Sequence, residues 1–408
     1  MRILLLSQWY LPEPAYNIHE LAQTLAEHGH DVTVLTGFPN YPTGKIYSGY
    51  RIYPWQKEKF DDVQVVRVPL FPEHSQSGLL RACNYISLAI SISLLGFWLV
   101  PKPDIMFVYH PPLTLGIPAW ILSRLWRIPF VFQIQDMWPE TLAATGMLNN
   151  SMILEGIQRF ANLIYRKANL IFVISPGFRR NLLSKNVPDE KIRVVSNWVD
   201  TEFYYPAQRD EQLAKALGLD GYFNIMFAGN IGEAQGLDTV IEAAKRLTDL
   251  PKIQFVIIGD GTARSALEQL KTEYQLNNIL FLGRYVGEKM STLYALADVL
   301  LIHLKDDPLF RMTIPHKTFA YMASGKPIIA ALSGDAADVV ISAGCGLTCN
   351  SEDPVAMADL VRQFYEMPIE DREALGQIAR DMVCTSYNRE ALISQIENSL
   401  CNIVDTSV

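Results

Sequence analysis

Short runs rich in Val, Ile, Leu and Phe recur along the whole chain at the length of β-strands, with helical patterns between them. Strands that are apolar throughout and alternate with helices are typical of parallel sheets covered by helices on both faces. The first series comprises residues 2–7, 31–36, 63–68, 105–109, 130–134, 170–174 and 192–195, and the second comprises residues 224–228, 254–258, 279–282, 299–303 and 327–331. The sequence therefore predicts two Rossmann-like, doubly wound α/β domains.

The length of the chain agrees with two domains, because 408 residues exceed one hydrophobic core of ordinary size. We place the break near residues 197–208, with a first domain over residues 1–200 and a second over residues 201–385. Ligands of doubly wound sheets bind at the carboxyl ends of the strands. We therefore expect the polar loops that follow the strands to line one reaction cleft between two facing domains.

The charge and the cysteines exclude some classes of protein. A net charge of −8 argues against nucleic acid as the main partner. Residues 1–200 carry 18 basic and 15 acidic side chains, whereas the remainder carries 17 and 28, so the first half suits an anionic membrane surface better. The five cysteines are scattered without a C-x-x-C pair, which predicts reduced thiols in a cytoplasmic protein.

Residues 82–101 contain no charged side chain and approach transmembrane length. However, Asn84, Ser87 and Ser91 form a polar stripe on one helical face, and a spanning helix would separate the first three strands from their sheet. We therefore expect a helix that does not span. Two interpretations stay open: a helix partly presented to the inner face of the plasma membrane, or a buried crossover helix.

Two segments of the second half have the composition of an anion site. The glycine-rich turn 229–236 follows a strand and precedes a helix expected near Leu237, where backbone N–H groups and the helix dipole favour an anion. A basic loop with Arg311, His316 and Lys317 leads into a helix that ends at Gly325. Either segment could instead be a plain turn or a solvated loop, but converging cations suit a diphosphate. The expected diphosphate contacts are Gly229, Asn230, Gly232, Gln235, Arg311 and Lys317.

A nucleoside would lie beside this diphosphate site. We place base recognition at Arg284, Tyr285 and Val286, where a strand end offers backbone groups and an aromatic face, although Tyr285 could simply pack. Asp335 and Asp338 open the next helix and could cap it or receive ribose hydroxyls.

Two residues of the first half are catalytic candidates. Asp136 follows a strand and precedes Trp138, so its carboxylate could act on a sugar hydroxyl or could cap the next helix. His110, at another strand end, is a weaker candidate and could be a hydrogen-bonded histidine without a role in the reaction. The chain has no D-x-D, H-E-x-x-H or P-loop motif, which disfavours a metal-dependent transferase, a zinc hydrolase and a P-loop enzyme.

Several segments together resemble the family 4 retaining glycosyltransferases of GT-B fold over nearly the whole chain. They are residues 26–34 (AEHGHDVTV), 196–203 (SNWVDTEF) and 323–328 (ASGKPI). Residues 36–44 (TGFPNYPTG), 135–140 (QDMWPE) and 228–236 (AGNIGEAQG) are similar to a narrower branch, the L-fucosamine transferases of surface-polysaccharide pathways.

The resemblance implies a nucleotide-sugar donor, UDP-linked in our expectation, bound to the second domain, and a lipid-linked or saccharide acceptor bound to the first. It implies transfer of an N-acetylated amino or deoxy hexose with retention, without a metal or other cofactor. The last segment, residues 386–408, should form a helix that crosses back to the first domain.

The chain departs from the family pattern at two places. The E-x7-E glutamates are replaced by Met312 and Ala320, the second of which lies at the expected nucleoside site. The Arg and Lys that usually bind the diphosphate are replaced by Asn230 and Gln235, so another cation must supply the charge. Two alternatives to a transferase therefore stay open: a UDP-sugar 2-epimerase of the same fold, and a non-catalytic sugar-nucleotide-binding partner of a transferase.

Overall fold

A computed structural model describes residues 1–75 and 77–407, and within it the chain forms two compact units. Unit 1 comprises residues 1–196 together with the segment from Leu392 onward, and unit 2 comprises residues 197–391. The expected boundary at residue 200 thus shifts to 196, and the chain returns to unit 1 at Leu392 instead of at residue 386.

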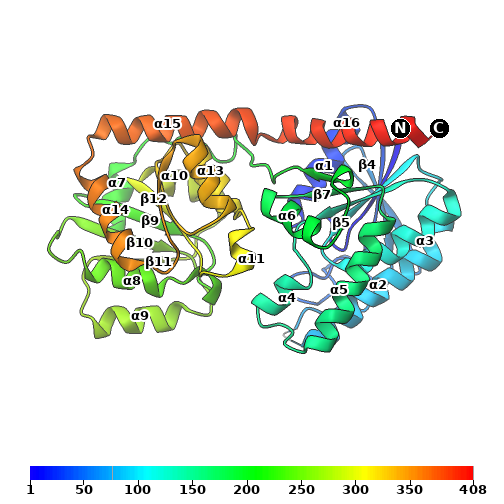
Figure 1. The fold of residues 1–408 in the computed structure, drawn as a ribbon, viewed down its shortest axis with the longest axis horizontal. Coiled ribbons are helices and arrows are strands. Elements are labelled where there is room, and N and C mark those ends of the chain that lie inside the picture. Colours follow the sequence, from blue (N-terminus) through cyan, green and yellow to red (C-terminus); the bar gives the residue numbers. More distant parts are fainter. Residues whose placement is uncertain (76, 408) are drawn as a thin grey trace. The chain divides into compact units, whose positions relative to one another are not determined.

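Unit 1 contains a sheet of eight strands in the order β3-β4-β2-β1-β5-β6-β7-β8. Figure 1 labels β4, β5 and β7 of this sheet. All neighbouring strands are parallel except the pair formed by β3 and β4, which is antiparallel. The strands are β1 (Arg2–Leu6), β2 (Asp31–Gly37), β3 (Gln56–Phe60), β4 (Val63–Val68), β5 (Ile105–His110), β6 (Phe130–Ile134), β7 (Leu170–Val173) and β8 (Ile192–Val194).

The helices of unit 1 cover both faces of this sheet. They are α1 (Tyr16–Glu27), α2 (Gly78–Leu99), α3 (Gly116–Trp126), α4 (Glu140–Ala144), α5 (Ser151–Lys167), α6 (Pro176–Ser184) and most of α16 (Arg389–Ser407). The crossover through α1 runs in the opposite direction along the sheet from the crossovers through α2, α3 and α5. Because such crossovers are right-handed, α1 lies on one face and α2, α3 and α5 lie on the other.

The C-terminal helix is anchored to unit 1 by a carboxylate. Glu397 of α16 contacts His28 Nδ1 at 2.6 Å and His30 Nε2 at 2.7 Å, both next to the start of β2. These contacts place α16 beside the end of α1.

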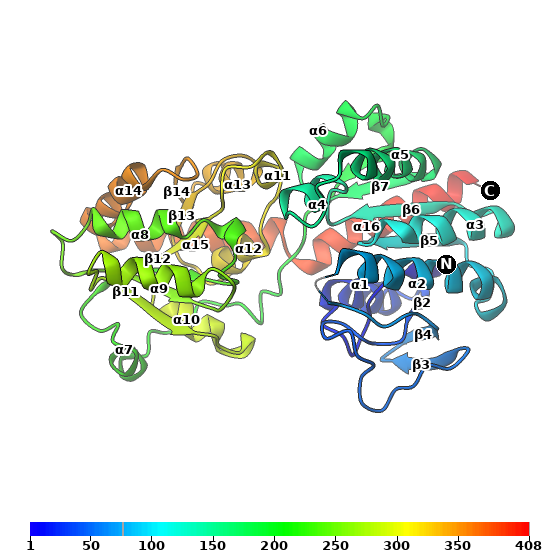
Figure 2. The ribbon, with the colours of Figure 1, turned by 90° about the horizontal axis from the view of Figure 1, so that it is seen from below.

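Unit 2 contains a fully parallel sheet of six strands in the order β11-β10-β9-β12-β13-β14. Figure 2 labels β11, β12, β13 and β14 of this sheet. The strands are β9 (Phe223–Ala228), β10 (Ile253–Ile258), β11 (Ile279–Gly283), β12 (Val299–His303), β13 (Ile328–Ala331) and β14 (Gly346–Cys349). The helices are α7 (Glu211–Leu217), α8 (Asp238–Lys245), α9 (Arg264–Glu273), α10 (Met290–Ala295), α11 (Pro308–Arg311), α12 (His316–Ala323), α13 (Asp335–Ala343), α14 (Pro354–Glu366) and α15 (Ile369–Ser386). One buried cluster lies under α10, α12 and α13, and a second lies under α8, α9 and α14.

Each strand expected from the sequence is present, with its ends shifted by at most one residue. Two strands were missed. The edge strand β3 reads QKEKF and has no apolar run, and β14 reads GLTC and is only four residues long. Both strands lie at the edge of their sheet. An edge strand pairs with another strand on one side only, so its sequence need not be apolar throughout.

Candidate functional site

A pocket of about 370 Å³ lies at the carboxyl ends of β9, β10 and β11 in unit 2. This is the end of a doubly wound sheet where ligands bind, next to the point where the strand order reverses between β9 and β12. The pocket is lined by Ala228, Gly229, Asn230, Ile258, Gly259, Asp260, Arg284, Tyr285, Met290 and Tyr294. The structure therefore brings together the predicted residues Gly229, Asn230, Arg284 and Tyr285.

The turn after β9, which contains Gly229, packs closely against the turn after β10, which contains Gly259. A Cβ atom on Gly259 would lie 1.8 Å from the carbonyl oxygen of Gly229, so no larger residue fits there. Across the same contact, the N–H of Gly229 donates to Ile258 and the N–H of Ile231 donates to Asp260, both at 2.9 Å. The amide of Gly229, a predicted diphosphate contact, is thus used between the loops and does not face an anion.

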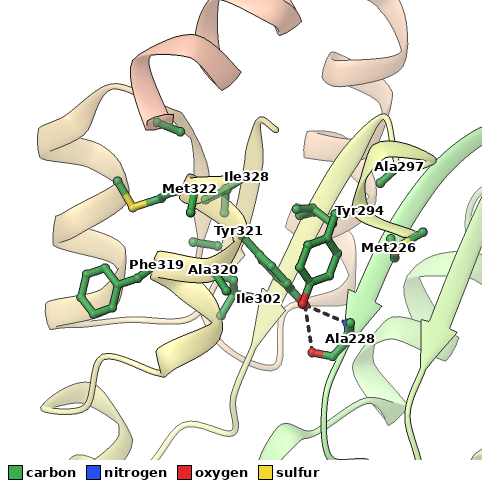
Figure 3. Packing of buried hydrophobic residues seen from close by; sticks show 14 of the residues in the cluster. Met226, Ala228, Tyr294, Ala297, Ile302, Phe319, Ala320, Tyr321, Met322 and Ile328 are labelled. Atoms are coloured by element: carbon green, nitrogen blue, oxygen red, sulfur yellow. Dashed lines mark hydrogen bonds between the residues drawn. The ribbon is translucent and has the colours of Figure 1, made fainter. Parts of the chain in front are cut away.

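Tyr321 of α12 fixes the end of β9 just before these loops (Figure 3). Its hydroxyl accepts from the N–H of Ala228 at 2.7 Å and donates to the carbonyl of Ala228 at 3.0 Å. The neighbouring Ala320 is 2% exposed and packs in the core beside Phe319 and Ile302 (Figure 3). The predicted nucleoside contact through the side chain of Ala320 is therefore wrong.

Lys317, in the first turn of α12, brings a partly buried cation to the glycine loop. Its Nζ donates to Gln235 Oε1 at 2.6 Å and lies 3.8 Å from the centroid of the Phe227 ring. It also lies 3.0 Å from the position that a Cβ on Gly229 would take. Burial lowers the pKa of Lys317 to about 7, since no carboxylate compensates its charge.

Gln235 and His303 hold Lys317 in place. The backbone carbonyl of Gln235 lies 2.6 Å from His303 Nδ1, at the end of β12, and His303 Nε2 accepts from the N–H of Glu352 at 3.3 Å. These two contacts assign the proton of the neutral ring to Nδ1, and burial lowers the pKa of His303. Gln235 thus orients the lysine, a role that sequence reasoning missed because His303 lies far from it along the chain.

The neighbouring Asn230 and Gly232 are close to each other. A Cβ on Gly232 would lie 2.8 Å from Asn230 Nδ2, so the asparagine side chain turns over this glycine. The side-chain amide of Asn230 therefore lies at the pocket, where it can contact a ligand.

Arg311 is not part of this site. Its Nε and one of its terminal nitrogens each donate to the Asp306 carboxylate at 2.7 Å, and its side chain is 55% exposed. Its backbone instead contacts Gly334 at the start of α13. The predicted diphosphate contact through Arg311 is corrected accordingly, because its charge is already compensated outside the pocket.

The remaining predicted nucleoside residues are spread over the rim of unit 2. Arg284 and Tyr285 line the pocket, whereas Val286 is 61% exposed and lies outside its lining. Asp335 is buried in the first turn of α13 and Asp338 is exposed on the same turn, and neither lines the pocket. The sequence missed Asp260, Met290 and Tyr294, which line it.

In unit 1, Asp136 lies two residues after the end of β6, partly buried, and burial raises the pKa of its carboxyl. His110, at the end of β5, is fully buried against Trp138 and Phe132. Within the described part of the chain neither of its ring nitrogens has a hydrogen-bond partner, and burial lowers its pKa to about 3. His110 therefore packs among aromatic rings at the end of β5, and its catalytic role stays a prediction.

Residues 1–75 and 77–407 contain no group of three or more His, Cys, Asp or Glu side chains arranged to hold a metal ion.

Comparison with known proteins assigns both halves of the chain. Residues 14–198 match the Glycosyl transferase 4-like domain, and residues 208–382 match the Glycosyl transferases group 1 domain. The chain is 28% identical over 324 residues to the protein described as probable glycosyltransferase WbjE of Pseudomonas aeruginosa, covering 78% of this chain and 80% of that protein. It is 28% identical over 293 residues to a protein described as a colanic acid biosynthesis glycosyl transferase, WcaI of Escherichia coli K12, covering 69% and 71%.

A solved structure of Anabaena Alr3699/HepE in complex with UDP and glucose superposes with a TM-score of 0.71 at 18% identity, covering 98% of this chain and 99% of that one. Its likeness confirms the predicted fold class, the GT-B fold with two parallel-sheet α/β domains.

Proposed function

Since the chain belongs to the glycosyltransferases that join a Glycosyl transferase 4-like domain to a Glycosyl transferases group 1 domain, we propose that it transfers a sugar from a nucleotide-sugar donor to a lipid-linked or saccharide acceptor. The donor binds in the pocket of unit 2 and the acceptor binds to unit 1. The sugar is an N-acetylated amino or deoxy hexose, and the product belongs to exopolysaccharide or O-antigen-type biosynthesis. Support for that setting comes from WcaI, whose description names colanic acid biosynthesis.

The observation that carries this proposal is the partly buried cation beside the glycine loop of unit 2. A departing nucleoside diphosphate needs positive charge where its own negative charge grows. Lys317 supplies that charge at the end of β9. Arg284 and Tyr285, which follow β11 and line the same pocket as Gly229, provide a surface for a base. HepE, described as a complex with UDP and glucose, supports a UDP-linked donor.

The reaction retains the anomeric configuration and needs no divalent cation. Retention is what the resemblance to family 4 implies. Support for metal independence comes from the absence of a D-x-D motif in the sequence, together with Lys317 as the alternative source of charge.

A transfer assay tests this function. We expect sugar transfer from one member of a panel of UDP- and GDP-sugars to a polyprenyl-diphosphate-linked acceptor, at the same rate with and without EDTA. Loss of activity in EDTA that magnesium or manganese restores would contradict metal independence. Epimerisation of a UDP-sugar at C2, or nucleotide binding without any turnover, would instead favour one of the two alternatives to a transferase.

We also propose that the protein works at the cytoplasmic face of the plasma membrane and binds it through α2 and α3. Among the described residues, α2 is the one helix long and apolar enough to cross a bilayer. However, it connects β4 and β5 of a single sheet, so it lies along that sheet. Its polar stripe faces inward, where Asn84 and Ser87 bond to the backbone of Phe71 at 2.6 and 2.8 Å.

The outward face of α2 is apolar and exposed. Ile86, Ile90, Leu94 and Trp98 follow each other at intervals of four residues, and the last two are 67% and 81% exposed. Phe97 stacks on Trp126 with centroids 5.7 Å apart, so the ends of α2 and α3 are adjacent. Lys102, Arg124 and Arg127 are exposed around these ends. An apolar helix face bordered by cations suits an anionic lipid surface.

Flotation with vesicles checks this membrane face. We expect the wild type to float with vesicles that contain anionic lipid, and a Leu94→Glu, Trp98→Glu variant to float at least about fivefold less, because each side chain contributes roughly 1.5–3 kcal/mol on burial. Tyr53 and Trp55 are 51% and 53% exposed elsewhere in unit 1, so Tyr53→Glu, Trp55→Glu is the matched control and should float like the wild type. If the wild type stays with the protein fraction at the bottom of the gradient, α2 is a solvent-exposed crossover helix only.

A further inference from the structure

Six aromatic rings form a continuous row at the carboxyl edge of the unit 1 sheet. Trp9 and Tyr41 have centroids 4.8 Å apart, Trp9 and Tyr85 6.4 Å, and Tyr85 and Trp138 6.2 Å. His74 extends the row beyond Tyr41 at 4.7 Å, and His110 ends it beyond Trp138 at 5.5 Å. We call Tyr41, Trp9, Tyr85 and Trp138 the aromatic row.

These rings come from separate segments that meet at one place. Trp9 follows β1, Tyr41 follows β2, Trp138 follows β6 and Tyr85 belongs to α2. The crossovers leave β1 and β5 in opposite directions, so the strand order of unit 1 reverses between these two strands. The crevice outside such a reversal is where ligands of open α/β sheets bind. The aromatic row therefore lies at the ligand-binding end of its sheet.

The four rings are partly exposed, whereas the polar groups beneath them are buried. Glu13 is 1% exposed and accepts from the N–H groups of Tyr10, Asn40 and Tyr41 at 3.1, 2.8 and 2.8 Å. This carboxylate ties the loop after β1 to the loop after β2. The loops that carry Trp9 and Tyr41 are thus held together before any ligand arrives, which lowers the cost of binding.

A second buried connection anchors α2 to the same two loops. Gln8 Nε2 donates to Asn84 Oδ1 at 2.8 Å, and Asn84 Nδ2 approaches Asn40 Oδ1 at 3.4 Å. All three side chains are nearly inaccessible. Tyr85, next to Asn84, is fixed relative to Trp9 and Tyr41 by this network.

Polar side chains of unit 1 lie near one end of the aromatic row. Asp136 lies two residues before Trp138. Burial raises the pKa values of Tyr85 and Tyr109, and the negative charge of Asp136 adds to this effect. Tyr109 also bonds to Asn17. A carboxylate and a phenol at one end can meet hydroxyl groups, whereas Trp9 and Tyr41 continue the row away from them.

This division fits a saccharide of more than one sugar. A pyranose presents C–H groups on its faces and hydroxyls on its rim, so it stacks on aromatic faces while its rim meets polar groups. A single sugar beside Asp136 would use Tyr85 and Trp138 and leave Trp9 and Tyr41 without a ligand. A purely apolar chain would not use the polar end.

We propose that the aromatic row binds an oligosaccharide acceptor of at least two sugars, with its reacting sugar at Tyr85 and Trp138 beside Asp136 and the next sugar on Trp9 and Tyr41. This inference rests on the proposed function and specifies its acceptor.

The test compares two polyprenyl-diphosphate-linked acceptors, one with a single sugar and one with three. We expect wild-type KM to be about tenfold lower for the longer acceptor. Trp9→Ala should raise KM for the longer acceptor about tenfold and leave KM for the shorter acceptor and kcat for both within about twofold. Trp9→Phe, which keeps a ring at this position, should restore most of the difference, and Trp55→Ala is the exposed control that should change nothing.

Equal KM values for both acceptors in the wild type, or an equal effect of Trp9→Ala on both, would overturn the proposal. A fluorescence titration without donor separates it from the proposed function. The free trisaccharide should change tryptophan emission in the wild type and much less in Trp9→Phe, even if no transfer is found. If polyprenyl phosphate without sugar gives the same change, the row binds a lipid chain and the proposal is wrong.

Discussion

Titration of a Lys317→Met variant with UDP should give a dissociation constant about tenfold to a hundredfold weaker than that of the wild type, because a charge-assisted hydrogen bond contributes about 1.5–3 kcal/mol. Lys317 is the cation beside Gly229, and Asn230 and Gln235 provide only neutral amides around it. The loss should shrink only slightly as salt is raised, because a partly buried charge pair is screened much less than an exposed one. Isothermal calorimetry measures this directly.

Arg311→Met is the matched control for this prediction. It removes a cation from the same basic loop, but one that is exposed and paired with Asp306. UDP affinity should stay within about twofold of the wild type, since that charge is already compensated at the surface. If Arg311→Met weakens UDP binding as much as Lys317→Met does, the diphosphate lies near α11 and not at the glycine loop.

The stability of Lys317→Met separates a lost contact from a lost fold. Burial lowers the pKa of Lys317 from its ordinary value to about 7, so the charged side chain destabilises the folded state at neutral pH. Removing it should leave the melting temperature equal to or above that of the wild type. A variant that binds UDP weakly and melts lower would point to a structural role for Lys317.

The second large effect is expected at Asp136, where Asp136→Asn should reduce kcat by about a hundredfold, within the range for losing a general acid or base. UDP affinity should be unchanged, because Asp136 belongs to unit 1 and the nucleotide pocket is built by unit 2. Steady-state kinetics together with UDP titration measure the two quantities. Asp62→Asn, an exposed carboxylate of unit 1 paired with Lys59, is the control and should have wild-type kinetics.

The pH profile gives Asp136 a second readout. Burial raises the pKa of this carboxyl, so the ionised form is lost at a higher pH than for an ordinary aspartate as the solution is acidified. The acidic limb of the kcat profile should therefore lie above the usual aspartate range and should disappear in Asp136→Asn. Unchanged turnover in that variant, or a loss of UDP affinity with the turnover, would contradict the role assigned to Asp136.

Most strands could be predicted from the sequence because each is marked by a contiguous run of apolar residues. Apolar runs such as those of β6 and β12 are buried on both faces, and their burial leaves a continuous pattern in the sequence. The edge strands β3 and β14 lack that pattern, so nothing local distinguishes them from loops.

Residues of the site could be predicted from the sequence only where they belong to one contiguous segment. The glycine turn at Gly229 and the strand end at Arg284 and Tyr285 are contiguous signals, and they do meet in one pocket. Arg311 and Lys317 look equivalent in the sequence, six positions apart, but Asp306 neutralises one and Phe227 and Gln235 enclose the other. Such pairing depends on side-chain direction, which composition and spacing do not encode.

The aromatic row shows the same limit. Trp9, Tyr41, Tyr85 and Trp138 are distributed over residues 9–138, with no spacing that links them. Only the order of the strands brings their segments to one edge of the sheet. A sequence shows each ring as a separate aromatic residue.

The most direct measurement of the central claim, that Lys317 neutralises the donor diphosphate, is the number of protons taken up when UDP binds. At pH 8 Lys317 is largely neutral in the free protein, because its pKa is about 7, whereas the terminal phosphate of UDP is fully ionised. A bound diphosphate raises the pKa of the lysine, so binding must take up a proton, and affinity must fall as pH rises above 7.

Calorimetric titrations at pH 8 in buffers of different ionisation enthalpy count these protons. The account predicts an uptake of close to one proton per UDP in the wild type, which vanishes below pH 6 and is absent in Lys317→Met. UDP binding at pH 8 without proton uptake in the wild type would contradict it.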